Sequence, residues 1–253
     1  MSEARLFQAL LAFVFVSGAA SFLALLLTPA PYGRYARPGW GPGLPAPAAW
    51  AVMEGTAAVA FLAFFARGPH TAGVVPLLLL ALWLSHYVPR AVFDPLAMRC
   101  RPHHMPLVLV GLGVLYNLVN AYLNATAIVR FGPARGPEWL AQPLVLAGLL
   151  LFAAGYGINR QADRALRALS EHGQGGYGLP RGGLYEHVSC PNYLGEILEW
   201  CGWALVAGTA AAWSFAFFTA CNLVPRALAH HRWYRRRFPG YPRRRRALVP
   251  RLF

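Results

Sequence analysis

Apolar runs long enough to cross a lipid bilayer recur along this chain, and they constrain its fold more than any other feature. A spanning helix needs about 20 apolar residues, because the hydrocarbon core is about 30 Å thick. We count seven such runs, at about 6–28, 46–65, 72–93, 105–129, 140–159 and, on either side of a tight turn near Gly208, between 192 and 225. The sequence therefore predicts an all-α integral membrane protein, with one seven-helix transmembrane domain over residues 1–253.

The composition agrees with a membrane protein. Hydrophobic residues make up 57% of the chain and charged residues only 13%, whereas a soluble domain carries about 25% charged residues. The net charge is +14, and all 23 basic residues are arginine. These arginines lie at the ends of the apolar runs, where they set topology and contact anionic lipid headgroups, so we do not expect a nucleic-acid partner. The four cysteines lack metal-ligand spacing, so no metal site is expected.

The arginines are divided unequally between the two sides of the predicted domain. One side receives the segments around Arg34, Arg90 and Arg160, together with the arginine-rich tail after Tyr234. Segments rich in arginine stay in the cytoplasm, so we expect the N-terminus outside and the C-terminus in the cytoplasm. The membrane would be the bacterial inner membrane for a bacterial source and the endoplasmic reticulum for a eukaryotic one. We expect a monomer in contact with membrane lipids.

Three stripes of polar residues interrupt the later apolar runs at this cytoplasmic end. Their spacing of three or four residues places each stripe on one face of a helix. The stripes are Asn159, Asp163 and Arg167; Asn192, Glu196 and Glu199; and Arg226, His230 and Tyr234. Ionisable groups within a membrane are costly and usually face a cavity, a partner or a site. A soluble cytoplasmic cofactor could reach all three stripes, although ordinary interfacial caps are the alternative interpretation.

Two residues in the earlier runs have the same character. Glu54 is the only charged residue in the 46–65 run, and it needs a partner or a proton-bearing, neutral state. Tyr87 lies near the end of the 72–93 run. The sequence is equally compatible with a catalytic residue and with an aromatic residue of the membrane interface at this position. Asn117, Asn120 and Asn124 share a face of the 105–129 run, and hydrogen bonds between helices are one explanation for them.

Residues 161–191 are expected to form a loop that contains the glycine-rich segment GQGGYGLPRGG. Such a loop can bring backbone N–H groups close to a phosphate. This segment matches neither the Rossmann nor the P-loop pattern, and a flexible linker is the alternative.

Several segments together resemble the steroid 5α-reductase family in their order and spacing. The strongest resemblance lies in GINRQADRALRAL, YGLPRGGLYEHVSCPNYLGEILEWCGWAL, FAFFTACNLVPRALAHHRWYRRRF and YPRRRRALVPRLF, and a sparser one in GLPAPAAWAVMEG and LSHYVPRAV. The chain departs from the family in YNLVNAYLN, which has no glycine, and at Ser170, where the family has an arginine.

The resemblance implies NADPH-dependent reduction of a Δ4-3-ketosteroid to its 5α-dihydro product, in a seven-helix fold whose interior holds steroid and cofactor. Residues from about 1 to 135 would supply the steroid side, and residues from about 136 to 253 the cofactor side. Glu54 and Tyr87 would hold the steroid 3-keto oxygen and polarise it while hydride reaches C5. The implied dinucleotide pocket comprises Asn159, Asp163, Arg167, Tyr177, Asn192, Glu196, Arg226, His230 and Tyr234, with Arg99 and Arg101 near the phosphates.

Three other functions compete with this one. A membrane methyltransferase that uses S-adenosylmethionine has a distantly similar C-terminal pair of helices and a basic tail. A reductase of another sterol or enone is a second alternative. A transporter or lipid-binding protein is a third, although transporters commonly contain internal repeats and this sequence has none that we can detect.

Overall fold

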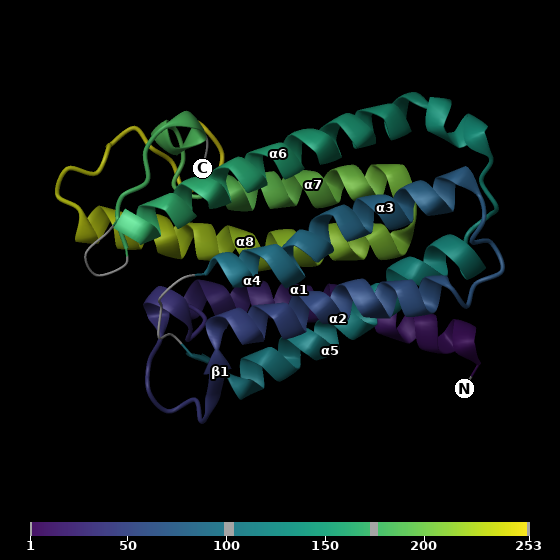
Figure 1. Cartoon of the computed structure of the whole chain (residues 1–253), viewed down its shortest axis with the longest axis horizontal. Coiled ribbons are helices and arrows are strands. Elements are labelled where there is room, and N and C mark those ends of the chain that lie inside the picture. Colours follow the sequence, from purple (N-terminus) through teal and green to yellow (C-terminus); the bar gives the residue numbers. More distant parts are fainter. Residues whose placement is uncertain (1, 99–103, 173–176, 252–253) are drawn as a thin grey trace.

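The computed structural model describes residues 2–98, 104–172 and 177–251. Most of these residues are helical, as the sequence predicts. Long helices lie along the longest axis of the molecule, and the two ends of the chain lie at opposite ends of the bundle (Figure 1). In chain order the long helices are α1 (Glu3–Leu27), α2 (Ala46–Phe65), α3 (Val74–Val88), α5 (Leu107–Thr126), α6 (Pro143–His172), α7 (Pro191–Ala207) and α8 (Ala210–Arg237).

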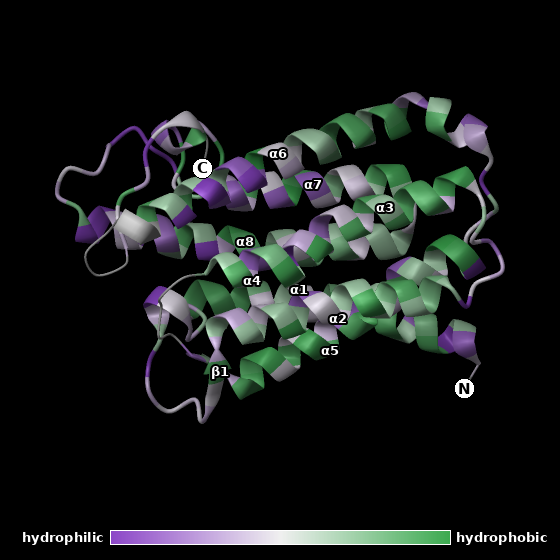
Figure 2. Cartoon of the chain, viewed as in Figure 1, coloured by the Kyte–Doolittle hydropathy of each residue, from purple (hydrophilic) through white to green (hydrophobic). Residues whose placement is uncertain are grey.

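Five helical segments in the described parts of the chain are long and apolar enough to cross a membrane. They are Glu3–Leu27, Ala46–Phe65, Val74–Ala97, Leu107–Phe131 and Pro143–Leu169. Hydrophobic residues cover much of these helices, and hydrophilic residues gather in the connecting segments near the C-terminus (Figure 2). By the same measure α7 is too short, with 17 residues, and polar residues interrupt the apolar sequence of α8. Five membrane-capable helices are therefore confirmed, and the total of seven spans stays a prediction.

Helix α6 is longer than its hydropathy indicates, and the loop expected over residues 161–191 is wrong at its start. The helix continues to His172. The residues after 159 are polar, but they keep helical spacing and their charged groups find partners: Arg160 and Arg167 both pair with Asp94. Paired charges allow a helix to continue beyond its apolar run, and the stripe from Asn159 to Arg167 therefore lies on one continuous helix.

Short elements connect these helices. Gly208 ends α7 in the left-handed region at φ 54°, where a glycine has no steric penalty, and this confirms the predicted tight turn before α8. A small antiparallel ribbon, absent from the sequence prediction, joins β1 (Gly43–Pro45) to β2 (His104–Pro106). The 3₁₀ turns are η1 (Gly33–Tyr35), η4 (Pro137–Ala141) and η5 (Gly183–Glu186).

Two helices end in a π-helical turn, in which each turn contains more residues than an α-helical one. Helix α3 passes through the π-turn η2 (Pro89–Phe93) into the short helix α4 (Asp94–Ala97), and α5 ends in η3 (Ala127–Phe131). Proline has no backbone N–H to donate, which explains a change of helical geometry at Pro89. The side chains of Arg90 and Asp94 therefore leave the helix at positions that an uninterrupted α-helix would not give them.

Aromatic rings from four helices fill the centre of the bundle. Trp83 of α3 packs against Phe61 of α2, Trp203 of α7 and Phe215 of α8, with ring centroids 4.4, 5.4 and 5.5 Å away. The Trp203 indole N–H donates to Asn124 Oδ1 of α5 at 3.1 Å. That bond confirms the interhelical hydrogen-bonding explanation for Asn124, and it satisfies a polar group that burial would otherwise penalise.

Glycines allow α6 and α7, which run antiparallel (Figure 1), to approach each other backbone to backbone. Gly155 lies opposite Gly195, and Gly148 lies opposite Gly202. A Cβ atom on Gly195 would stand 2.5 Å from the backbone nitrogen of Asn159, and one on Gly202 would stand 2.6 Å from the Gly148 carbonyl oxygen. Small residues of this kind are the usual means of close helix packing in membranes.

We predict that Gly202→Ala destabilises the protein by about 1–3 kcal/mol, because the added methyl group overlaps the backbone of α6 and forces the helices apart. Gly157→Ala is the matched control: it adds the same methyl group to α6 where no atom lies within 4 Å. Unfolding of both variants in detergent, followed by circular dichroism, measures the difference. Equal stability of the two variants would contradict the proposed role of the glycine contact.

Candidate active site

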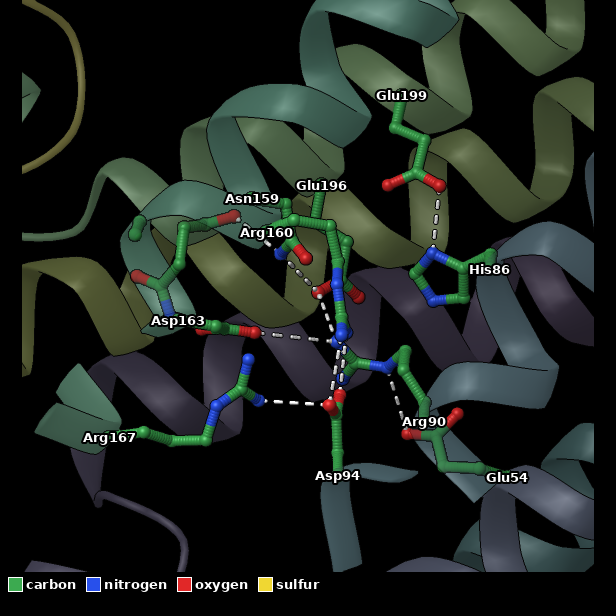
Figure 3. Close-up of polar contacts among 12 residues, drawn as sticks. Glu54, His86, Arg90, Asp94, Asn159, Arg160, Asp163, Arg167, Glu196 and Glu199 are labelled. Carbon is green, nitrogen blue, oxygen red and sulfur yellow. Dashed lines mark hydrogen bonds and ion pairs between the residues drawn. The ribbon is translucent and has the colours of Figure 1, made fainter. Parts of the chain in front are cut away.

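Arg90 lies at the centre of a cluster of carboxylates inside the bundle (Figure 3). Its Nε atom is 3.4 Å from Glu54 Oε1 on α2. Its Nη1 atom is 3.7 Å from Glu196 Oε2 on α7 and 3.9 Å from Asp163 Oδ2 on α6. One guanidinium thus faces carboxylates from three helices, and it offsets the cost of placing those charges in an apolar bundle.

Asp94 extends this cluster through two further arginines, Arg160 and Arg167 (Figure 3). Both oxygens of Asp94 accept hydrogen bonds from Arg160, at 2.7 and 3.0 Å, and Oδ1 also accepts one from Arg167 at 2.9 Å. Two parallel bonds of this kind fix the orientation of both groups. We call the seven residues the Arg90 cluster: Glu54, Arg90, Asp94, Arg160, Asp163, Arg167 and Glu196.

Amide side chains join the first two predicted stripes to each other. Asn159 Nδ2 donates to the backbone oxygen of Asn192 at 3.0 Å and to Glu196 Oε2 at 3.5 Å. Asn192 Nδ2 donates to Asp163 Oδ1 at 3.2 Å. The structure therefore brings together five predicted cofactor residues, these four and Arg167, on the neighbouring helices α6 and α7.

Tyr87 is buried inside the bundle and lies close to this cluster along the chain. It stands in the last turn of α3, three residues before Arg90, and the π-turn η2 begins between the two residues. Its ring contacts Trp83 and Trp200, with centroids 4.8 and 5.7 Å away. The buried position shows that Tyr87 belongs to the interior of the bundle and excludes the interfacial alternative.

Glu199, the third member of its stripe, contacts a different partner from Glu196. Its Oε1 atom is 2.8 Å from His86 Nδ1, and both side chains are almost completely buried. The His86 ring also meets Tyr87 edge to face, with centroids 4.9 Å apart. Glu199 therefore fixes His86, and His86 in turn supports one side of Tyr87.

The third stripe contacts a separate group of residues, which come from the N-terminal loop and from the start of α7. His230 lies between two tyrosine hydroxyls, with Nδ1 3.0 Å from Tyr35 and Nε2 3.0 Å from Tyr193. Arg34 Nη2 donates to the Tyr234 hydroxyl at 3.4 Å. Burial raises the pKa of Tyr35 to about 12, so its hydroxyl keeps its proton at neutral pH.

A cavity of about 170 Å³ opens beside this group. Tyr32, Arg34, Tyr193, Arg226 and His230 are among the residues that line it. Arg34 Nη1 and Arg226 Nε are buried there, and neither has a hydrogen-bond partner among the described residues. Tyr177 lies near this group as well: the Arg34 guanidinium is 4.9 Å from the centre of the Tyr177 ring.

The sequence reasoning missed several residues of this site. Arg34, Arg90 and Arg160 were assigned only to topology, and Asp94 and His86 were given no role. The number of acidic residues could have pointed to these partners. The chain has only nine aspartates and glutamates, and each one inside a membrane needs a partner. The predicted phosphate contacts Arg99 and Arg101 lie outside the described residues.

We predict that Arg90→Leu destabilises the protein by about 3–5 kcal/mol, because it leaves buried carboxylates without their central cation. Arg130→Leu is the control. Arg130 pairs with Glu3, but both side chains are more than two-fifths exposed, and a surface pair contributes about 0–1 kcal/mol. Denaturation of both variants in mixed micelles gives the comparison, and a loss of similar size for Arg130→Leu would refute a special role for Arg90.

Comparison with known proteins identifies the family. The family model described as 3-oxo-5-alpha-steroid 4-dehydrogenase matches residues 103–253. Over 256 residues the chain is 36% identical to steroid 5-alpha-reductase DET2 of Gossypium hirsutum, covering 100% of this chain and 99% of the relative. It is 37% identical to 3-oxo-5-alpha-steroid 4-dehydrogenase 1 of Bos taurus (99% of this chain, 98% of the relative) and of Homo sapiens (100% and 98%). The chain therefore belongs to the 3-oxo-5-alpha-steroid 4-dehydrogenase family, the family that its motifs resemble.

Proposed function

We propose that this protein is a steroid 5α-reductase, which uses NADPH to reduce the Δ4 double bond of 3-oxo-Δ4-steroids to 5α-dihydrosteroids. One observation supports this most directly: Glu54 and Tyr87, the two residues expected at the steroid carbonyl, are both buried in the interior of the bundle, where Glu54 pairs with Arg90. Because the chain belongs to the steroid dehydrogenase family, we no longer propose a methyltransferase or a transporter.

The chemistry requires a polarised enone. As hydride reaches C5, negative charge builds on the 3-keto oxygen, and a hydrogen-bond donor placed there stabilises the transition state. We assign that donation to Tyr87. Glu54 assists, either as a second donor in its protonated form or by orienting Tyr87. Arg90, 3.4 Å from Glu54, holds this carboxyl group in place.

His86 and Glu199 act as positioning residues for Tyr87 in this proposal. A donor contributes most when it is already aimed at the developing charge. The 2.8 Å bond between Glu199 and His86 fixes the imidazole that packs against the Tyr87 ring. Rotation of Tyr87 toward His86 is therefore blocked, and its hydroxyl is left to the substrate.

The residues of the third stripe fit the phosphates of a dinucleotide. Arg34 Nη1 and Arg226 Nε are buried donors at the cavity without partners among the described residues, and guanidinium groups suit phosphate oxygens. We assign Arg34, Arg226, His230, Tyr234 and Tyr177 to this role. At about 170 Å³ the cavity is smaller than the roughly 300 Å³ at which ligand sites begin, so the neighbouring segments must move apart to admit a whole dinucleotide.

The amide and carboxylate groups of α6 and α7 suit the nicotinamide end of the cofactor. A carboxamide needs both a donor and an acceptor, and Asn159, Asp163, Asn192 and Glu196 supply them beside Tyr87. NADPH, when bound, supplies the hydride. From the resemblance alone, Arg99 and Arg101 remain proposed phosphate contacts, and Arg167 remains a proposed residue of the dinucleotide pocket.

We also propose that the chain is a single integral membrane domain with seven spans, the N-terminus outside and the C-terminus in the cytoplasm. Two observations support this topology. Helices α7 and α8 pack inside the same bundle as the five membrane-capable helices, and the two chain ends lie at opposite ends of that bundle (Figure 1). A monomer suffices, because the proposed site is formed within one chain.

The test of this function is turnover by the purified protein in detergent, with testosterone or progesterone and NADPH. We expect a product heavier by two hydrogens that co-elutes with the 5α standard and requires NADPH. No product with NADPH or NADH, combined with thermal stabilisation by S-adenosylmethionine, would overturn the proposal.

We predict that Tyr87→Phe and Glu54→Gln each lower kcat by about 10²–10³. Tyr87→Phe removes the donor to the carbonyl oxygen, and Glu54→Gln replaces the carboxyl group by an amide, which cannot carry the same proton or charge. Stabilisation of the protein by NADPH should be retained in both variants. Tyr122→Phe is the control, since it removes a buried hydroxyl that has no hydrogen-bond partner among the described residues. Steady-state kinetics decide: rates near those of the parent in both variants would remove the pair from the chemistry.

We predict that Arg226→Gln raises KM for NADPH by roughly 10–100-fold with a smaller effect on kcat. This range corresponds to the loss of one charge-assisted hydrogen bond, worth about 1.5–3 kcal/mol. Arg130→Gln removes the same charge from the exposed pair with Glu3 and should leave KM unchanged. If both variants raise KM equally, Arg226 has no specific contact with the cofactor.

A further inference from the structure

A second and larger cavity, of about 530 Å³, lies between the end of α8 and the segment that follows it. Its polar lining comes from His231, Arg235, Tyr241, Arg243, Arg245 and Arg246. None of the residues predicted to bind the cofactor lines it. On α8, His231 and Arg235 each follow one of those residues by a single position, which turns them about 100° around the helix.

Arg245 is the most unusual residue of this cavity. Its side chain is 1% exposed, and its one hydrogen bond to a described residue runs from Nη1 to the Pro180 carbonyl oxygen at 3.1 Å. The Tyr241 ring lies 5.2 Å from the guanidinium carbon. Nε and Nη2 are shielded from solvent and have no hydrogen-bond partner among the described residues. The charge of Arg245 therefore adds to that of the exposed arginines around the cavity, which favours an anion there.

One carboxylate stands near Arg245. Glu186 Oε2 lies 3.8 Å from Arg245 Nη2, too far for a hydrogen bond, and its side chain is about half exposed. A hydrogen bond from the Gly182 N–H lowers the pKa of Glu186, so this carboxylate is ionised at neutral pH. Four arginines line the cavity, and a single carboxylate leaves a clear excess of positive charge.

The walls of the cavity are held in place. The C-terminal segment pairs with residues 187–190: Ser189 N donates to the Arg246 carbonyl oxygen at 2.8 Å, and Arg246 N donates to that of His187 at 2.9 Å. The Ser189 hydroxyl also lies 2.7 Å from His231 Nδ1 and 2.5 Å from the Tyr241 hydroxyl. The cavity is therefore part of the folded structure and does not depend on a chance approach of an arginine-rich tail.

We propose that this cavity is a binding site for a phosphate group, separate from the reductase site. Arginine presents planar, paired N–H donors that match phosphate oxygens, and a volume of about 530 Å³ lies within the roughly 300–1,000 Å³ of ligand sites. The phosphate belongs either to an anionic lipid headgroup, since basic pockets near a membrane bind such groups, or to a soluble phosphate ester.

The test uses the full-length protein in an uncharged detergent and compares two double variants of equal charge. Arg235→Gln with Arg243→Gln alters exposed arginines that line the cavity, and it spares the buried Arg245, whose loss could impair folding. Arg237→Gln with Arg244→Gln alters exposed arginines of the same segment that do not line it. Thermal stability is titrated with inorganic phosphate at constant ionic strength, and separately in nanodiscs with and without phosphatidylglycerol.

We expect the probe to stabilise the parent protein in a saturable way. Its apparent affinity should fall at least about tenfold in the lining variant, and it should stay within about twofold of the parent value in the matched control. Saturation by inorganic phosphate supports a soluble ester as the ligand, and an effect confined to phosphatidylglycerol supports a lipid headgroup. Three results would overturn the proposal: no saturable effect of either probe, equal losses in the two variants, or competition of the probe with NADPH, which would make the cavity part of the cofactor site.

Discussion

The close contact between α6 and α7 is the constraint on which the rest of the structure depends. Helices in a membrane gain little from the hydrophobic effect when they associate, so their contact relies on packing and hydrogen bonds. Facing glycines remove the side chains that would separate the two backbones. Asn159 can then reach the Asn192 carbonyl, and Asn192 can reach Asp163. With even one methyl group between the helices, these short amide side chains could not span the gap.

The Arg90 cluster shows how the bundle tolerates charge. Four carboxylates and three guanidinium groups occupy one region (Figure 3), and each ion is close to a partner of opposite sign. Pairing of this kind seldom stabilises a protein beyond an apolar equivalent. The proposed reduction would move a hydride and a proton, and it would need groups whose charge the protein controls, so the proposed function explains the cluster better than stability does.

The sequence allowed us to predict which polar residues share a helix face, but not which helices these residues contact. The stripes of Asn159, Asn192 and Arg226 were predictable, because helical periodicity places their members on one face. Their partners were not: Glu199 shares a face with Glu196, yet it contacts His86 on α3. Such pairings depend on how helices distant in the chain are arranged, and that arrangement follows from packing. The length of α6 was missed for a related reason, since hydropathy does not register charges that are neutralised by a partner from another helix.

The π-turn η2 has a consequence for sequence change in this family. A π-turn contains an extra residue compared with an α-helical turn, and each residue in a helix advances the side chains by about 100°. If the residues of Pro89–Phe93 took α-helical geometry instead, α4 would rotate by about that amount. Asp94 would then turn away from Arg160 and Arg167. This short segment should accordingly tolerate exchange of Val92 or Phe93 for another apolar residue far better than replacement of Pro89, where the helical geometry changes.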